Sequence, residues 1–375
     1  MRIIDEAKAS EYLVSRAAYI IEGKIWIAPN NSNSIIECSL KSKTAENIYG
    51  IDEPAKEYMF SRIVKINNEL YFIPADAEDM WCIDLENRKL RKIDIGLTNQ
   101  EKSIKYKFGA AIANDNNKRL FLIGSALAGI IKLDTITGEC CRIEDLNDRG
   151  VFKEEGRLYG AYAVCNNVIY APFYGTSSVL RLDINNDYIE IISIDKLPKQ
   201  YYSYVCSKDG DLYFYGPDDN EYIIDTKNKR VKLINQLAMI KKDKNRRYAY
   251  VYHGKNRTIY LPVVWSSVYI DNKDESELIE YKVDQKKLNG IGEGHYSRYE
   301  FVVNDDERLY FQSRIDGEIY EINLKSLCVD KFYMKISQEC LGYLIKNRME
   351  NSASEVVVED SVVNLSLFVK TVGEL

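Results

Sequence analysis

Seven basic residues recur at similar intervals along the sequence, and several of them lie next to tyrosines. The basic residues are Arg16, Arg62, Lys107, Arg157, Lys199, Arg247 and Arg298. The neighbouring tyrosines include Tyr159, Tyr202 and Tyr248. Guanidinium groups pair with carboxylate or phosphate oxygens, and a tyrosine ring offers a flat apolar face together with a hydroxyl. This combination is suited to binding an anionic or sugar-like ligand.

The segments that contain these residues carry a local excess of positive charge. Residues 10–16, 52–62, 96–108, 147–159, 195–202, 237–248 and 292–299 together hold 17 Lys and Arg against 11 Asp and Glu, in a chain of net charge -6. Surface charges also pair with one another, and each such pair contributes little to stability. Two interpretations therefore stay open: a self-paired polar surface, or a basic, tyrosine-lined binding site.

Residue types that usually carry catalysis or metal binding are scarce. His253 lies in a segment typical of a solvated turn, and His295 lies in a loop that has no catalytic-triad signature. Cys140 and Cys141 would alternate between the two sides of a strand, which makes joint binding of one metal ion difficult. No glycine-rich phosphate-binding loop occurs. We therefore predict no catalytic residue, metal or cofactor, and we leave open whether the protein is an enzyme.

A repeated pattern of short strands would position the basic residues. Seven segments combine a turn rich in Asn, Asp or Gly with an apolar strand that contains an aromatic residue. These aromatic residues are 45, 50, 49, 43, 47 and 50 residues apart, and they are Trp26, Tyr71, Phe121, Tyr170, Tyr213, Tyr260 and Tyr310. That period suits a four-stranded unit packed between two neighbours. We predict an all-β fold: a seven-bladed β-propeller of four-stranded antiparallel blades, with a small C-terminal helical appendage.

The ends of the predicted third strands share a further pattern. An Asp or Asn precedes another turn by two or three residues, as in CIDLENRKL from Cys82 and IKLDTITGEC from Ile131. With the preceding hairpins, this pattern resembles the kelch-type β-propeller family over residues 15–336. The paired glycines of kelch repeats are missing, and only Gly124, Gly175 and Gly216 lie near their places. The resemblance therefore implies an architecture and no functional residues.

The repeats divide the chain into three parts. Residues 1–14 are predicted to cap the ring or pair with an edge, residues 15–336 form the propeller, and residues 337–375 form an appendage docked on it. Within the sixth repeat, Trp265 to Glu277 is predicted to be the longest loop on the face that carries the basic residues. It would act as a lid or a protein contact, or it is a neutral insertion.

Composition limits the location and the partners. The negative net charge argues against nucleic acid, and no window approaches the roughly 20 apolar residues that span a bilayer. The first residues lack a secretory signal pattern, and the eight cysteines read as small buried hydrophobes, so a cytoplasmic location is predicted.

Two functions follow from these observations. The first is a non-catalytic scaffold that binds a protein or an anionic or sugar-like ligand around the central channel. The second is a carbohydrate-active enzyme, a lyase or glycoside hydrolase, at the same place. The predicted ligand-binding residues are Arg16, Arg62, Lys107, Arg157, Tyr159, Tyr202, Arg247, Tyr248, Trp265 and Arg298.

Overall fold

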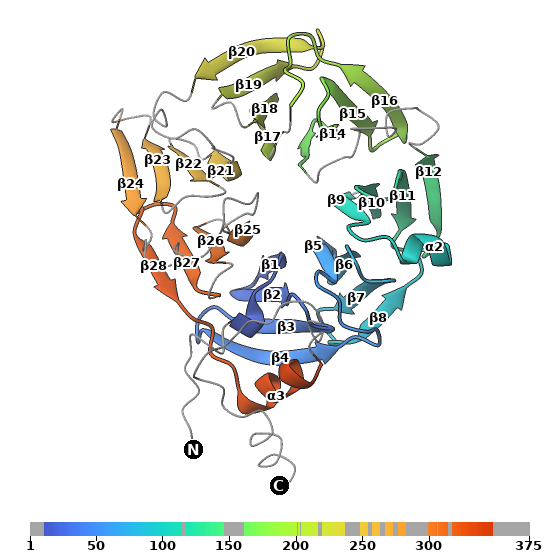
Figure 1. Ribbon diagram of the computed structural model, residues 1–375, viewed down its shortest axis with the longest axis vertical. Helices are drawn as coiled ribbons and strands as arrows, with labels where there is room; N and C mark the ends of the chain where they lie inside the picture. The colour runs from blue at the N-terminus through green and yellow to red at the C-terminus, as the bar shows by residue number, and fades with distance from the viewer. Residues whose placement is uncertain are drawn as a thin grey trace, which may run out of the picture.

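The chain forms a β-propeller of four-stranded antiparallel sheets arranged around a centre (Figure 1). This computed structural model describes residues 11–114, 118–145, 161–200, 202, 204–216, 220–236, 248–253, 257–262, 267–272, 277–282, 299–305, 307–313 and 317–347. Seven four-stranded sheets are hydrogen-bonded within these residues, and each coincides with one of the predicted repeats. The predicted β-propeller of four-stranded antiparallel blades is confirmed.

Each sheet is built from four strands that follow one another in the chain, so the innermost strand is always the first. The first three sheets contain β1 (Ala17–Ile21), β2 (Lys24–Ala28), β3 (Ser34–Ser39) and β4 (Thr44–Gly50); β5 (Phe60–Ile66), β6 (Glu69–Pro74), β7 (Met80–Asp84) and β8 (Leu90–Ile93); β9 (Phe108–Asn114), β10 (Arg119–Gly124), β11 (Gly129–Asp134) and β12 (Cys140–Asp145).

The other sheets have the same order of strands. They contain β13 (Ala163–Cys165), β14 (Val168–Pro172), β15 (Ser178–Asp183) and β16 (Tyr188–Ser193); β17 (Tyr204–Lys208), β18 (Asp211–Tyr215), β19 (Asn220–Asp225) and β20 (Arg230–Gln236); β21 (Tyr248–His253), β22 (Arg257–Pro262), β23 (Ser267–Asn272) and β24 (Glu277–Lys282); β25 (Tyr299–Asn304), β26 (Arg308–Ser313), β27 (Ile319–Asn323) and β28 (Val329–Phe332).

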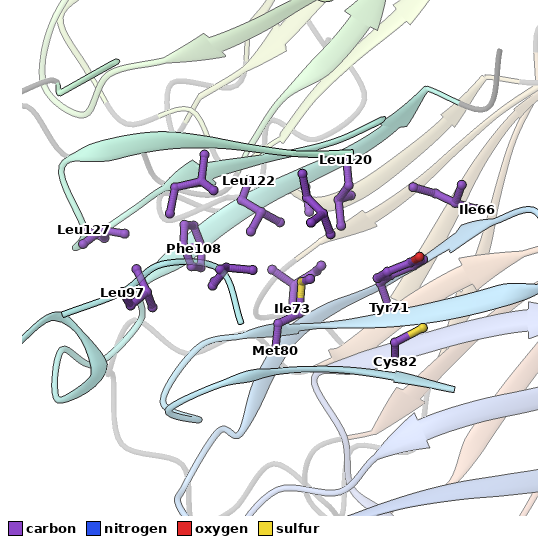
Figure 2. Close-up of a cluster of buried hydrophobic side chains, with 14 residues drawn as sticks. Ile66, Tyr71, Ile73, Met80, Cys82, Leu97, Phe108, Leu120, Leu122 and Leu127 are labelled. Atoms are coloured by element: carbon purple, nitrogen blue, oxygen red, sulfur yellow. The ribbon is translucent and has the colours of Figure 1, made fainter. Parts of the chain in front are cut away.

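The second strands are apolar on both faces because each sheet is packed between two others. In β6, Leu70 and Phe72 face the β1–β4 sheet, whereas Tyr71 and Ile73 pack against residues of the β9–β12 sheet. Figure 2 shows the second of these clusters, with Tyr71 and Ile73 on one side and Leu120 and Leu122 on the other. The predicted aromatic anchors all lie in second strands.

The Asp that ends the third strands has a structural role in the following turn. Asp84 Oδ1 accepts hydrogen bonds from the backbone N–H groups of Glu86 (2.8 Å) and Asn87 (3.2 Å), and Asp134 and Asp225 make the same kind of contact. Four residues after Asp84, Arg88 has a left-handed backbone with φ of 58°. Asp side chains stabilise such turns by binding their own backbone two or three residues on. The repeated Asp is therefore a turn residue.

The two ends of the described chain meet at the β1–β4 sheet. Gln312 of β26 accepts a hydrogen bond from Ser15 N–H (2.9 Å) and donates one to Leu13 O (3.1 Å), and Leu13 ends the short 3-10 helix η1 (Glu11–Leu13). After β28, Lys335 pairs with the outer strand β4, and α3 (Gln338–Lys346) packs nearby (Figure 1). The predicted helix near Gln338 is confirmed, while the later part of the appendage lies outside the described residues.

One predicted loop is wrong. The sixth repeat was expected to have a long loop from Trp265 to Glu277, but residues 267–272 form strand β23. The alternation of Val268 and Ile270 with polar residues is short, and the acidic residues that follow it obscured the strand signal. Trp265 itself lies outside the described residues.

Candidate functional site

Two kinds of loop open on the same end of the propeller, which we call the mouth. These are the loops that lead into the first strand of a sheet and the loops that connect its second and third strands. They contact one another across neighbouring sheets: Lys107 N–H, just before β9, donates to Ala75 O, just after β6 (3.0 Å). The mouth is therefore assembled from segments far apart in the sequence.

Arg16 lies at the mouth against two tyrosines from the next two sheets. Its guanidinium carbon is 4.5 Å from the ring centroid of Tyr58 and 5.8 Å from that of Tyr106, and the two rings are 5.9 Å apart. The Arg16 side chain is exposed, and it forms no ion pair with any residue that the structure describes. We call these three residues the Arg16 cluster. It combines an exposed cation, Arg16, with the faces of two tyrosines that were not among the predicted residues.

Tyr106 is held in an unusual backbone conformation. Its φ is 54°, a left-handed value that is strained for a bulky residue outside a hairpin turn. Its N–H donates to Asp76 Oδ1 (3.0 Å), and its carbonyl accepts from Ala126 N–H (3.0 Å). The ring remains 41% exposed, whereas Tyr58 is only 5% exposed. Tyr106 is thus fixed by its backbone and open to solvent at its side chain.

Lys107 does not present its charge to the mouth. The side chain is 0% exposed, and Nζ donates to the carbonyl oxygens of Ala77 (2.9 Å), Asp76 (3.3 Å) and Ala75 (3.5 Å). Burial lowers the pKa of Lys107 to about 8. The prediction that Lys107 contacts a ligand is corrected, because its three donors are occupied by backbone carbonyls beneath the surface.

Acidic residues in the β6–β7 loop and next to it are engaged within the protein. Glu53 accepts from the N–H groups of Glu78 (2.7 Å) and Asp79 (3.2 Å) and from Trp81 Nε1 (2.8 Å). Asp79 forms ion pairs with Lys92 and Lys102, which hold its pKa below its usual value although burial alone would raise it. This part of the mouth fits the self-paired interpretation.

A second basic residue reaches across the inner strands. Arg62 Nε donates to Gly109 O (3.1 Å) at the start of β9, and its guanidinium carbon lies 4.8 Å from the ring centroid of Tyr162, which leads into β13. Further around the centre, the rings of Tyr204 and Tyr250 are 5.0 Å apart. Burial raises the pKa of Tyr250 to about 12 and that of Tyr204 well above its ordinary value. Within the described inner strands, a cation, Arg62, and the uncharged tyrosines Tyr204 and Tyr250 are thus available to the central opening.

The remaining predicted residues divide into buried and undescribed ones. Tyr202 is 2% exposed and donates its hydroxyl to Pro198 O (2.7 Å), so it packs within the fold and does not line the mouth. The side chain of Tyr248, a residue of β21, lies outside the described part, as do Arg157, Tyr159, Arg247, Trp265 and Arg298. These residues stay predictions.

The interpretation of His253 as a solvated turn residue is wrong. It is the last residue of β21, and its Nε2 lies 2.7 Å from the hydroxyl of the buried Tyr215, which also bonds to Glu221. Its Nδ1 lies 3.4 Å from Thr258 Oγ1. A histidine followed by Gly and Asn reads as a turn in sequence, and only the neighbouring sheet reveals its partner.

Sequence reasoning also missed Tyr58, Tyr106 and Tyr162. A local signal existed for two of them, because Tyr58-Met59-Phe60 and Tyr106-Lys107-Phe108 repeat the pattern Tyr-x-Phe at the start of a sheet.

One concavity of about 500 Å³ lies away from the mouth. Its lining includes Arg119 and Lys132, and both cations pair with Asp187 of the next sheet. Its other lining residues are Asp134, Glu139, Cys140 and Cys141. Among the described residues, no cluster of three or more His, Cys, Asp or Glu side chains is arranged to hold a metal ion.

None of the helices in the described residues is long and apolar enough to span a membrane.

No protein-family model matches the chain, and no curated protein matches it either. The kelch-type resemblance therefore rests on the sequence pattern alone. Solved structures share the fold. Virginiamycin B lyase from Staphylococcus aureus aligns with a TM-score of 0.57 at 12% identity, over 81% of this chain and 93% of that one. BamB from Moraxella catarrhalis gives a TM-score of 0.54 at 12% identity, over 81% and 82%.

A computationally designed protein, Ika8, is similar to the same degree. It aligns with a TM-score of 0.55 at 9% identity, over 87% of this chain and 91% of its own. Virginiamycin B lyase, BamB and the designed protein thus resemble this propeller about equally in TM-score. At these identities the likeness shows the fold alone, and function has to be argued from the site.

Proposed function

We propose that this protein is a binding protein whose mouth takes an anionic, sugar-like ligand, and that it does so without catalysis. The observation that carries the proposal is Arg16, an exposed guanidinium held against Tyr58 and Tyr106 and without a carboxylate partner in the described chain. Guanidinium groups bind carboxylates and phosphates in a bidentate manner. The exposed Tyr106 ring adds a flat apolar surface beside that charge.

The proposal takes all seven sheets as blades of one closed ring. Hydrophobic clusters that bridge each successive pair of sheets support this view, and the last of them joins Ile25 and Ile27 of β2 to Phe301 and Tyr310 of the β25–β28 sheet. In such a ring, the loops before β1, β5 and β9 lie side by side. The cationic position at each predicted repeat would then line one opening.

The test is retention on an array of anionic and neutral glycans. The wild-type protein is expected to be retained on uronate-containing and sulfated glycans and not on neutral ones. Arg16→Ala is expected to abolish this retention, and Arg16→Lys to restore it only in part, because an ammonium lacks the planar bidentate geometry. Arg230→Ala is the matched control, since Arg230 is exposed at the start of the outer strand β20, in a sheet that lies across the ring from β1 (Figure 1).

Loss of retention in both alanine variants would indicate nonspecific charge attraction and would overturn the proposal. Retention unchanged in Arg16→Ala would do so as well.

A carbohydrate-active enzyme is the second candidate, because an Arg and a Tyr also converge at Arg62 and Tyr162. Glycoside hydrolysis needs two carboxyl groups about 5–9 Å apart. Asp79 of the β6–β7 loop is ion-paired and the neighbouring Glu53 accepts hydrogen bonds from that loop, which favours the binding role. Release of reducing ends from the retained glycans would favour the enzyme instead. The cytoplasmic location inferred from the sequence remains part of the proposal.

A further inference from the structure

Lys107 is a fully buried cation directly beside the exposed Tyr106. Buried lysines are rare unless their charge is compensated. Here the three N–H donors of the ammonium group face three consecutive carbonyls, those of Ala75, Asp76 and Ala77. The carbonyls belong to the β6–β7 loop of the preceding sheet, so the side chain joins two sheets at the mouth.

We propose that Lys107 is a positioning residue that fixes Tyr106 for ligand binding. This inference rests on the proposed function of the Arg16 cluster. The middle residue of the loop that Lys107 holds is Asp76, whose Oδ1 accepts the N–H of Tyr106 (3.0 Å). Lys107 therefore acts on Tyr106 through Asp76 without touching the ligand.

The strained backbone of Tyr106 explains why such a residue is needed. A left-handed φ of 54° is unfavourable for tyrosine, and it persists only where the surroundings impose it. The same segment is held from the other side, because Lys107 O accepts from Ser125 N–H (2.7 Å) and from Leu127 N–H (3.3 Å). If the β6–β7 loop were released, the hydrogen bond from Tyr106 N–H to Asp76 would be lost. Tyr106 would then relax toward negative φ, which moves its ring relative to Arg16.

The preceding sheet contains an internal control. Tyr58-Met59-Phe60 has the same pattern, and Met59 O accepts from Ala75 N–H (2.9 Å) and Ala77 N–H (3.1 Å) as Lys107 O does one sheet later. Tyr58 is buried and does not have a left-handed φ. Where the tyrosine is held by packing, the following residue is an apolar Met59.

The first test is amide hydrogen exchange in Lys107→Met, which introduces the residue that the preceding sheet uses. The Tyr106 amide is expected to lose protection by about tenfold or more, as a population shift of that size would require. Lys105→Met, which removes an exposed lysine of the same loop, is the control and should leave Tyr106 exchange unchanged. Unchanged Tyr106 exchange in Lys107→Met would overturn the inference, whatever the protein binds.

The second readout is a pH profile of the same amide in the wild-type protein. Lys107 is surrounded by Lys56, which lowers its pKa further, and by Asp76, Glu53 and Glu78, which oppose that shift. Opening of the β6–β7 loop would expose Lys107 to water and return its pKa toward 10.5, so above about pH 8 the open state binds more protons than the closed state. The protection factor of Tyr106 should therefore rise from pH 7 to 9 in the wild type and stay flat in Lys107→Met. A protection factor that follows the same course in both proteins would contradict the positioning role.

Binding of polygalacturonate separates this inference from the proposed function. Lys107→Met should weaken binding about tenfold, in line with the lost population of the competent state. If Arg16→Ala abolishes binding and Lys107→Met leaves it unchanged, the positioning role is wrong and the proposed function stands. If the wild-type protein does not bind polygalacturonate at all, the exchange result alone decides the positioning role.

Discussion

The segments that lead into the second and third sheets share a sequence pattern and a set of backbone hydrogen bonds but use their central residue differently. In Tyr58-Met59-Phe60 the middle side chain packs in an apolar cluster, and in Tyr106-Lys107-Phe108 it binds three carbonyls. The first tyrosine is buried, and the second is exposed and strained. The difference shows that the fold requires a buried side chain at the position of Met59 and Lys107, but not a charged one. The charge at Lys107 serves the geometry of the mouth.

The largest effect on stability is expected at Gly124 of the third sheet, a position where the second sheet has Pro74. Gly124 pairs with Phe108 as Pro74 pairs with Phe60, but a Cβ at Gly124 would lie 1.7 Å from Leu127 O. Gly124→Ala must therefore displace backbone and should lower the free energy of unfolding by roughly 2–3 kcal/mol. Chemical denaturation measures this change.

Gly129→Ala, five residues on, is the matched control. A Cβ there meets its nearest atom at 3.6 Å, an ordinary contact, so only a small change is expected. Equal losses in the two variants would show that the loop around Leu127 does not constrain the third sheet.

A smaller effect should distinguish Lys107 from Met59 through pH. The pKa of Lys107 is about 8 in the folded protein and 10.5 in the unfolded chain, so between these values the unfolded state binds more protons. The stability of the wild type relative to Lys107→Met should therefore rise with pH across this window, by on the order of 1–2 kcal/mol after allowance for solvent screening.

The free energy of unfolding has to be compared between the wild type and Lys107→Met, because the buried cysteines lower the stability of both proteins as pH rises. Burial raises the pKa of Cys82 to about 12 and that of Cys140 to about 11, so both proteins lose stability as the unfolded thiols ionise above their ordinary pKa. Urea denaturation at pH 7, 8, 9 and 10 gives the two slopes. A constant or falling difference would mean that Lys107 is not buried as a cation.

The smallest effect is expected at Arg16. Its side chain is exposed and pairs with no described carboxylate, so Arg16→Ala should change the free energy of unfolding by no more than about 0.5 kcal/mol. Thermal unfolding of the variant and the wild type provides the measurement. A clear loss of stability would assign Arg16 to the fold and would weaken its role in binding.

The architecture was predictable from sequence because its signals are local and repeated. Leu70, Tyr71, Phe72 and Ile73 are apolar without alternation, which indicates a strand buried on both faces, and β6 is buried on both faces. The Asp at the end of the third strands is visible in the sequence as a repeated feature. Its role in the turn became clear only from the hydrogen bonds that Asp84 accepts from Glu86 and Asn87. Strand β23 was not predicted because its apolar stretch is short and polar residues flank it on both sides.

The site was only partly predictable because burial is decided by segments distant in sequence. Arg16 and Lys107 look alike as basic residues before a first strand. Only the β6–β7 loop, about 30 residues earlier in the chain than Lys107, removes the charge of Lys107 from the surface. Likewise, the partner of His253 is Tyr215 of the neighbouring sheet. No local pattern encodes either contact.

The most direct measurement of the central claim is a calorimetric comparison of polygalacturonate with its methyl ester, which keeps the sugar chain and removes the charge. Wild-type protein should bind the anionic form at least about tenfold more tightly, a difference of about 1.4 kcal/mol, and Arg16→Ala should bind both forms alike. Equal affinity of the wild type for the two forms, or a preference that survives Arg16→Ala, would contradict the account of Arg16 as the residue that selects an anionic ligand.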